Sequence, residues 1–508
     1  MARIVVIGAG VGGLGVGLAC GRQGHEVVLV ERDDTPLPQD ADGAFDWDRR
    51  GAPQVRHSHA FLARLRNLLL ERHPDVLDAL LDAGATPLDF IAMLPEGMDR
   101  TPMPGDDELV ALACRRTTFE WVLRRVVTGL DGEHTPLVEL RHGHGVTSLV
   151  TTGSGDGVPQ VVGVELDDGT RIDADVVVDA SGRRSPLPAL LAQRGVELPE
   201  HDEDTGIIYF SRFFRLLDGA EYPPQLGPIG GDLEYLKFGV FQGDNRTFSI
   251  TLAARVHDDE LRRRLLDPDT FLEVAAQIPA TERHVEADRA EPITGVHVMA
   301  RLLNRRRHFT DEHDRPRVLG LHAVGDAHTC TNPLYGRGCS LAMVQAHLLA
   351  DALDAHGLDH AARAAAYEAA TATEITPWYR AAVSQDRMGR RARDAEARTS
   401  DGPGAESQGD ESPGNGSASP NDETASGDDP EQFVRQLLTD GLFPALRVDP
   451  VVLRAFLRML NLLRPPDSLM ADGAVISRVM AVYAERDQRP PPPPIGPSRD
   501  ALLATLDA

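Results

Sequence analysis

The residues with the clearest chemical use are glycines at the start of the chain. Gly8, Gly10 and Gly13 form a G-x-G-x-x-G turn, with Gly12 inside it, directly after the apolar run 4–7. In such a turn the first glycine allows the bend, the second lets a pyrophosphate approach the backbone, and the third lets helix and strand pack closely. The N-terminus of the following helix offers free N–H groups and a positive dipole end to phosphates. This pattern predicts a phosphate-binding turn.

An acidic residue further along supports a dinucleotide. A second apolar run, 27–30, ends in Glu31, which follows Gly13 by 18 residues. A carboxylate there can accept hydrogen bonds from a ribose diol. A glycine turn alone also occurs in βαβ units that bind nothing, but here strand, turn, helix, strand and acid follow in order. We therefore predict dinucleotide binding, and these residues leave open which dinucleotide.

A second anion site is predicted far along the chain. A strand ending in Asp326 is followed by a loop with Pro333, Gly336 and Gly338 and by a helix expected from about 340 to 356. The start of this helix would attract negative charge as the first one does. One dinucleotide that contacts both helix ends would be a long cofactor, extended through the protein.

Further candidates lie in a polar loop and at a helix start. Arg56, His57 and His59 belong to a segment rich in hydrogen-bond donors. Two histidines without a third ligand make a poor zinc site, so we predict no metal and interpret the segment as the wall of a cofactor or substrate pocket. Arg116 opens a helix and could contact a phosphate or lie in solvent; the sequence leaves both open. No residue is identified as a protein nucleophile.

The elements that position these residues predict an α/β fold: a doubly wound, three-layer dinucleotide-binding domain with an inserted, mainly antiparallel sheet and a C-terminal helical extension. The binding domain is expected over 1–195 and, with long helices, over 305–398, and the inserted substrate domain over 196–304. Residues 399–430, acidic and poor in apolar side chains, are predicted to be a disordered linker, and 431–508 a helical segment.

Aromatic side chains concentrate in the insert, and most are expected to form its core. An apolar stripe with arginines over 450–463 could contact a membrane surface or pack on the body of the protein, and packing is the preferred interpretation.

The amino-acid composition limits the kinds of binding partner that this protein is expected to have. The 508 residues carry a net charge of −26, which argues against nucleic acid or an anionic membrane as the main partner. The four cysteines are scattered without a C-x-x-C pair, and no apolar window is long enough to span a membrane. No signal region precedes the first strand. A cytoplasmic, reduced protein is expected.

With these motifs in hand, the chain resembles the class A flavoprotein monooxygenases, the superfamily of para-hydroxybenzoate hydroxylase, squalene epoxidase and the flavin halogenases. Three motifs match in order: the glycine turn with Glu31, residues 179–185 as a variant of the family's D-G motif, and Asp326 through Gly338. Residues 53–59 look like those of a bacterial branch that contains polyether epoxidases. The resemblance spans about residues 3 to 360.

The resemblance implies FAD as the cofactor and a role for each motif. Glu31 would bind the adenosine ribose, and Arg116, in an arrangement similar to the family's FAD-phosphate helix, the phosphates. Asp326 would hold the ribityl chain or its adjoining phosphate, and the helix after Gly338 would direct its positive end at the flavin pyrimidine edge. Ala180 stands where the D-G motif has glycine. The electron donor, NAD(P)H or reduced flavin from a separate flavin reductase, therefore stays open.

The implied activity is hydroxylation or epoxidation of a small hydrophobic or aromatic molecule, with oxygen activated as a flavin C4a-hydroperoxide. An FAD-dependent reductase or dehydrogenase, similar to a prenyl reductase, is the main alternative. A flavin halogenase is less favoured, because the W-x-W-x-I-P signature is missing and Lys237, the single lysine, is a poor match for the halogenase lysine. The non-enzyme alternative is a binding protein of the same fold that has lost flavin.

Overall fold

A five-stranded parallel sheet forms the base of the fold. The structure, a computed structural model, describes residues 1–94, 97–153, 157–223, 230–400, 433–434, 436–490 and 494–507, with the backbone alone over 391–400. The strands of the parallel sheet follow the order β18 (Leu321–Ala323), β9 (Val176–Asp179), β1 (Arg3–Ile7), β2 (Glu26–Glu31) and β5 (Val138–His142). Every neighbouring pair is parallel. Continuous apolar runs form such strands because both faces of the sheet are covered.

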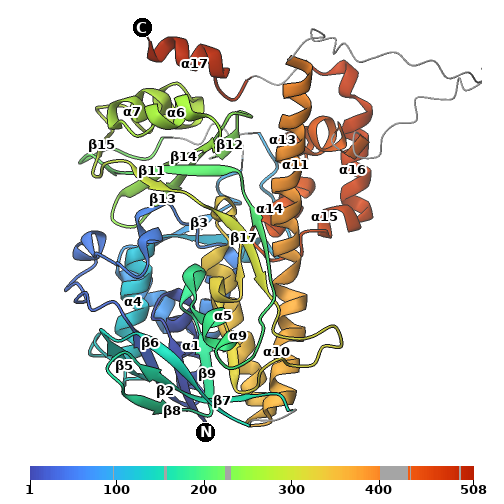
Figure 1. Cartoon of the computed structure of the whole chain (residues 1–508). Helices are drawn as coiled ribbons and strands as arrows, with labels where there is room; N and C mark the ends of the chain where they lie inside the picture. The colour runs from blue at the N-terminus through green and yellow to red at the C-terminus, as the bar shows by residue number, and fades with distance from the viewer. Residues whose placement is uncertain are drawn as a thin grey trace, which may run out of the picture.

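Different layers cover the two faces of this sheet (Figure 1). Helices α1 (Val11–Arg22), α4 (Arg116–Thr128) and α9 (Gly338–His356) share one core with alternate strand residues such as Val6. Neighbouring residues such as Val5 join the opposite core, because successive strand side chains point to opposite faces. That second core is closed by the antiparallel strands β6 (Val146–Thr152), β7 (Gln160–Leu166) and β8 (Arg171–Asp173) and by the short helix α5 (Leu187–Ala192).

The predicted layers and a parallel sheet are therefore present. A doubly wound sheet would carry long helices on both faces, and that part of the prediction is wrong for the second face. The physical reason is the tight turn at Gly169, which has a φ of +82° and folds β7 back onto β8 as a hairpin.

A short antiparallel ladder joins this domain to a second sheet. Strand β10 (Glu200–Asp204) carries the chain out and β17 (Leu303–Arg307) carries it back; the two pair along their whole length, and β17 also pairs with β19 (Thr329–Cys330). Ion pairs stabilise the ladder, with Arg305 2.6 Å from Asp202 and Arg307 3.0 Å from Glu200. The second sheet is thus inserted between two strands of one ladder. The domain limits at 196 and 304 stay a prediction.

The inserted sheet has the order β12 (Gly230–Asp232), β13 (Leu236–Gln242), β14 (Thr247–Arg255), β11 (Ile207–Leu216) and β15 (Ala290–Pro292), with β16 (His297–Met299) also on β11. One face packs on α6 (Asp259–Arg264), α7 (Pro268–Ala276) and α8 (Pro279–Glu282), and most aromatics predicted as core lie in that cluster: Phe210, Phe214, Tyr235, Phe238 and Phe248. The alternate residues, including Tyr209, Ser211 and Thr251, lie on the other face.

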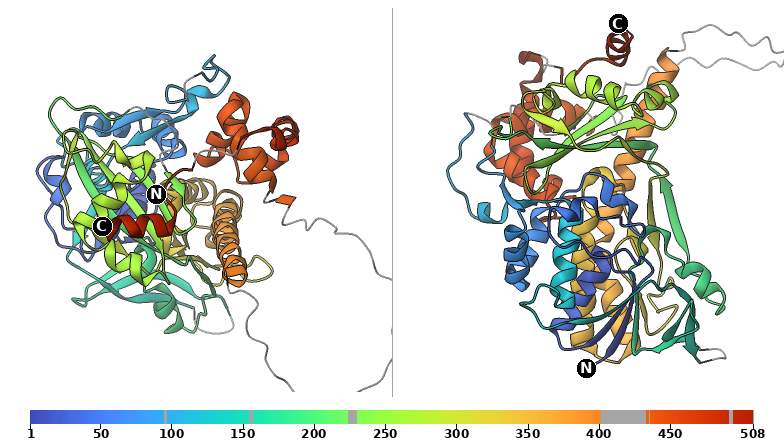
Figure 2. Two further views of the ribbon diagram at one scale, coloured as in Figure 1. Left: turned by 90° about the horizontal axis from the view of Figure 1, so that it is seen from above. Right: turned by 90° about the vertical axis from the view of Figure 1, so that its left-hand side faces the viewer.

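Helices complete the body. α2 (Ala63–Arg72), α3 (Pro74–Asp82) and the strand pair β3 (Thr86–Asp89) and β4 (Val110–Ala113) lie between β2 and α4 in the chain. After α9, α10 (His360–Glu374) leads into the long α11 (Thr376–Ser400), which runs alongside both sheets (Figures 1 and 2). The helical prediction for this region is confirmed. Of the predicted linker, 399–400 end α11 and 401–430 lie outside the described residues.

The C-terminal segment packs in two places. Helices α13 (Phe443–Val448), α14 (Pro450–Leu460), α15 (Ser468–Ala471) and α16 (Gly473–Ala484) lie beside α11, whereas α17 (Arg499–Leu506) lies on the insert (Figure 1). The guanidinium of buried Arg454 is 3.0 Å from the Asp106 carboxylate, and Asn461 accepts a 3.0 Å bond from the Ala63 N–H. Packing of this stripe on the body is therefore confirmed. Within the described residues, no helix combines the length and apolar character that a membrane span requires.

Candidate functional site

The three glycines of the first turn have different surroundings. Gly8 has a φ of +98°, and a Cβ there would lie 2.8 Å from the Ala180 carbonyl oxygen. A Cβ on Gly13 would lie 1.8 Å from the Gly8 carbonyl oxygen, so strand β1 and helix α1 touch at this point. A Cβ on Gly10 would meet no atom within 4 Å. The outer glycines thus serve the turn itself, and Gly10 leaves open space.

That space belongs to a central cavity of about 1120 Å³ between the parallel-sheet domain and the insert. Small-molecule sites usually measure about 300–1,000 Å³, so this cavity is slightly larger than the usual range. Nine of the ten residues predicted to bind the cofactor line it: Gly8, Gly10, Gly12, Glu31, Arg116, Asp326, Pro333, Gly336 and Gly338. Gly13 does not line it and acts through packing.

The cavity is positively charged although the chain is acidic. Eight arginine or lysine side chains line it against three carboxylates, whereas the whole chain carries −26. Clefts lined by one sign of charge attract ligands of the opposite sign. The cavity is therefore suited to a ligand with several negative charges.

A buried ion-pair network connects the predicted ribose and phosphate residues. Glu31 accepts backbone N–H bonds from Ala9 (2.9 Å) and Asp33 (3.0 Å). The Arg49 guanidinium lies 3.7 Å from Glu31 and 3.2 Å from Glu120, and donates to the Ala9 carbonyl (3.2 Å). Arg49 is 2% exposed and was missed in the sequence, because one arginine in a polar loop carries no periodic signal.

Arg116 completes this network. Its Nε donates to Glu120 (2.7 Å) and its Nη1 to His59 Nε2 (3.2 Å). Burial disfavours the charge on Arg116, but Glu120 outweighs it and raises the pKa; burial likewise opposes ionisation of Glu120, whose pKa is lowered by Arg116 and Arg49. Both stay charged. A solvent-exposed Arg116 was one of two predictions and is wrong, because its side chain is 12% exposed.

His59 has a fixed tautomer. Its Nδ1 is 2.9 Å from the His57 carbonyl, which only accepts, so Nδ1 carries the proton and Nε2 accepts from Arg116. Burial first, and then the Arg116 charge, lower the pKa of His59 well below its usual value. His59 is thus a neutral residue that orients Arg116.

A chain of hydroxyl groups joins this segment to the insert. His57 Nδ1 lies 3.1 Å from Ser211 Oγ, Ser211 lies 2.8 Å from Thr251, and Ser58 lies 2.7 Å from both Thr251 and Ser249. The three strand residues alternate with buried apolar residues on β11 and β14, and this period of two is the sequence signal that could have identified them. The predicted pocket-wall role of residues 56–59 agrees with this position, since all four line the cavity.

The second helix end also opens into the cavity. β18 ends just before Asp326, whose pKa is raised by burial against the opposing charges of Arg116 and Arg183. The loop before α9 is held by Asp386 of α11, a residue that the sequence did not indicate. Asp386 accepts bonds from Asn304 (2.7 Å), Asn332 (3.0 Å) and Tyr335 (3.1 Å).

Hydrogen bonds also fix the segment 179–185, which resembles the D-G motif. Asp179, at the end of β9, accepts 2.9 and 2.5 Å bonds from the backbone N–H and hydroxyl of Ser181, and a further bond from the Ser185 hydroxyl. Burial raises its pKa despite these bonds. Ala180 and Ser181 line the cavity beside the glycine turn.

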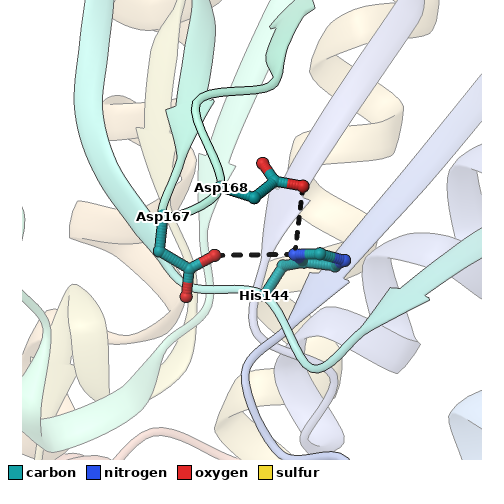
Figure 3. Close-up of side chains that lie close together, drawn as sticks. All are labelled: His144, Asp167 and Asp168. Atoms are coloured by element: carbon teal, nitrogen blue, oxygen red, sulfur yellow. Dashed lines mark ion pairs between the residues drawn. The ribbon is translucent and has the colours of Figure 1, made fainter.

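Among the described residues, one group of three side chains has metal-ligand types within 4.8 Å of one another: His144, Asp167 and Asp168 (Figure 3). His144 Nδ1 lies 3.5 Å from Asp167 and 3.6 Å from Asp168. Asp167 and Asp168 are exposed and His144 is half-buried, and their contacts join a loop to the β7–β8 turn. His57 and His59 are not part of this group.

Comparison with known proteins identifies one related sequence and several structures with a similar fold. No protein-family model matches the chain. Protein Rv3254 of Mycobacterium tuberculosis (strain ATCC 25618 / H37Rv) is 31% identical over 371 residues, which are 69% of this chain and 73% of that protein. The structure of pqsL from Pseudomonas aeruginosa, described as a probable FAD-dependent monooxygenase, has a TM-score of 0.51 at 17% identity and covers 76% of this chain and 94% of its own. The flavin-dependent brominase Bmp2 has a TM-score of 0.52 at 17% identity, with coverages of 78% and 91%.

The fold is that of the class A flavoprotein monooxygenase superfamily, and the resemblance inferred from the motifs is confirmed. Within it, the chain belongs to the same family as the mycobacterial protein Rv3254.

Proposed function

We propose that this chain is an FAD-dependent monooxygenase that hydroxylates or epoxidises a small hydrophobic or aromatic molecule. The observation that carries the proposal is a single cationic cavity that reaches from the glycine turn, past Arg116 and Asp326, to the inserted sheet. FAD has a pyrophosphate to place near cations and a long shape to fill such a cavity.

The residues present fit FAD at one end of the cavity. The open space at Gly10 admits a pyrophosphate at the N-terminus of α1, where Gly8, Gly12 and Gly13 shape the turn. Arg116 Nη2 has no bond to a described residue and is available for a phosphate oxygen. Glu31 would exchange a backbone bond for the adenosine ribose, and Asp326 would hold the ribityl chain.

The loop 333–338 and the start of α9 would hold the flavin ring. Gly336 has a φ of +64°, and a Cβ there would lie 2.9 Å from the Ala60 side chain, so glycine is required for this close approach. FAD supplies the reduction and oxygen chemistry when bound. The protein contributes the bonds of Asp386 that fix the loop, the positive end of α9, and a wall that excludes water.

The wall on the insert side suits a hydrophobic substrate. Tyr209, Phe238, Phe241 and Met299 line the cavity there, and Tyr209 donates a 3.1 Å bond to Asn332 of the flavin loop. Lys237 is bound to Asp232 at the partly exposed rim, which supports oxygenation over halogenation because its ammonium is occupied by a carboxylate.

The experiment begins with the purified protein. A yellow protein that retains about one FAD per chain is expected, and a colourless protein that FAD does not reconstitute would support the binding-protein alternative. Anaerobic mixing with NADPH or NADH then tests direct reduction: bleaching of the flavin indicates a self-sufficient enzyme, and its absence a partner flavin reductase. Turnover of candidate substrates under isotopically labelled oxygen distinguishes a monooxygenase, whose product gains one labelled atom, from a reductase, which turns over without oxygen.

A further inference from the structure

Four basic side chains from three separate segments of the chain line the central cavity. They are Arg56 at the end of a 3-10 turn (Pro53–Arg56), His57 after it, Arg183 in a second turn (Gly182–Arg184), and His297 in β16. The rings of His57 and His297 are 6.3 Å apart between centroids, in an edge-on arrangement. Strand β11 fixes both, because Ser211 bonds His57 Nδ1 and pairs with His297 in the sheet.

This cluster has little negative charge of its own. Arg49, Arg307 and Arg454 are buried and each contacts a carboxylate, at 3.2, 3.0 and 3.0 Å. Within the described part of the chain, Arg183 forms no ion pair with any carboxylate, although it is partly buried. Arg56 has a partner, but that ion pair with Asp48 is exposed at the rim. The oxyanion of a ligand would supply the counter-charge that Arg183 lacks.

Burial first, and the neighbouring positive charges second, lower the pKa of both histidines in this cluster. Burial and then the charges of His297 and Arg183 lower the pKa of His57 to about 3, and burial and then Arg56 lower the pKa of His297. Both imidazoles are therefore neutral near pH 7 and each has one N–H to donate. Asp326 also faces Arg183, but the two form no ion pair.

We propose that Arg183 and His297, with His57 and Arg56 beside them, form a subsite for an oxyanion of a second ligand, separate from the FAD phosphates. The proposal rests on the proposed function. The ligand would carry a carboxylate or a phosphate: either a substrate with an apolar body and a carboxylate, or the phosphate of a nicotinamide dinucleotide. Arginine matches both groups with a planar pair of donors.

The position supports a second ligand over FAD itself. His297 belongs to the inserted sheet, and its strand neighbour Met299 lines the apolar wall of the cavity. The predicted FAD-phosphate contacts lie instead at the start of α1 and at Arg116. An anion held between Arg183 and His297 would bridge the two domains next to the flavin end.

Binding to the flavin-loaded protein tests the proposal. Octanoate and NADPH serve as oxyanion probes and octanol as the matched neutral probe, each followed by the change in flavin absorbance and by calorimetry. Arg183→Gln should weaken at least one oxyanion probe about ten- to a hundredfold, the loss of one charge-assisted pair, and leave octanol unchanged. His297→Gln should weaken the same probe about three- to tenfold, and Arg183→Lys should recover part of the affinity.

The two probes distinguish the sources of the anion. Loss confined to octanoate identifies a carboxylate substrate, and loss confined to NADPH identifies the dinucleotide phosphate. Arg171→Gln, on exposed β8 outside the cavity, is the control and should bind both probes as the wild type does.

Three results would overturn the proposal: equal affinities of wild type and Arg183→Gln for both oxyanions, no binding of either probe to the wild type, or loss of FAD with Arg183→Gln, which would assign Arg183 to the cofactor. FAD content is measured first in every sample. A protein that binds no FAD refutes the proposed function, and calorimetry still measures the anion subsite.

Discussion

Alanine substitutions in the first glycine turn separate its structural role from its binding role. A Cβ on Gly13 would lie 1.8 Å from the Gly8 carbonyl oxygen, whereas such contacts are essentially never shorter than 3.0 Å. Helix α1 would have to withdraw from strand β1 by at least about 1.2 Å. Because α1 is packed between α4 and α9, Gly13→Ala should cost about 3 kcal/mol of unfolding free energy, the upper part of the range for overpacked cores.

Gly10→Ala should behave in the opposite way. Gly10 has a φ of −85°, which alanine adopts easily, and no atom lies within 4 Å of its Cβ position. Because alanine is a poorer N-cap than glycine, the FAD-free Gly10→Ala protein should lose about 1 kcal/mol of unfolding free energy, less than Gly13→Ala loses. The methyl group would instead occupy the approach of the pyrophosphate, and FAD should bind about ten- to a hundredfold more weakly.

Two measurements check this pair. Urea unfolding of the FAD-free proteins, followed by the fluorescence of the buried tryptophans, reports stability, and titration with FAD reports affinity. Gly389→Ala is the matched control, because it also has no atom within 4 Å but lies on α11 away from the cavity. A urea midpoint unchanged in Gly13→Ala, or FAD affinity unchanged in Gly10→Ala, would refute the geometry of the turn.

Three further outcomes are expected. Arg49→Ala should lower the unfolding free energy by about 3–5 kcal/mol, because Glu120 loses a buried partner; Arg49→Lys should restore only part of it, and an unchanged urea midpoint would contradict the network. Asp386→Ala should lower flavin affinity or turnover with little change in secondary structure by circular dichroism, since two bonds to the loop before α9 and one to Asn304 of β17 are lost; wild-type flavin affinity and wild-type turnover would disprove it. His73 has its pKa lowered to about 3, by burial first and then by His347, against about 6.5 when unfolded, so the unfolded chain takes up the extra proton and stability falls as pH drops from 6.5 toward 3. His73→Gln should reduce this slope by up to about 1.4 kcal/mol per pH unit, and urea midpoints between pH 7 and 5 that fall equally in both proteins would rule it out.

The first βαβ unit could be predicted because its information is local. Apolar runs next to one another specify buried strands, and glycines at fixed spacing specify the turn and the close helix contact. The second helix end after Gly338 follows from the same kind of signal. These features placed nine of the ten predicted residues around one cavity, although their binding roles stay proposals.

Other features could not be predicted from local residues, because they depend on strand register and on how the layers pack. Whether the β7–β8 hairpin at Gly169 would cover the parallel sheet depended on which face of that sheet remained apolar and unfilled. Similarly, Ser211 and Thr251 read as ordinary strand residues. Only the pairing of β11 with β14 places their hydroxyls 2.8 Å apart and facing Ser58.

The sequence by itself determined the parallel fold, the glycine turn and the two helix ends, because each depends on residues close together in the chain. The tertiary structure decided which distant residues meet: Arg49 between Glu31 and Glu120, Asp386 beside the loop before α9, and His297 opposite His57. Those contacts span tens to hundreds of residues and are fixed by strand register and domain closure, which no local pattern of residue types encodes.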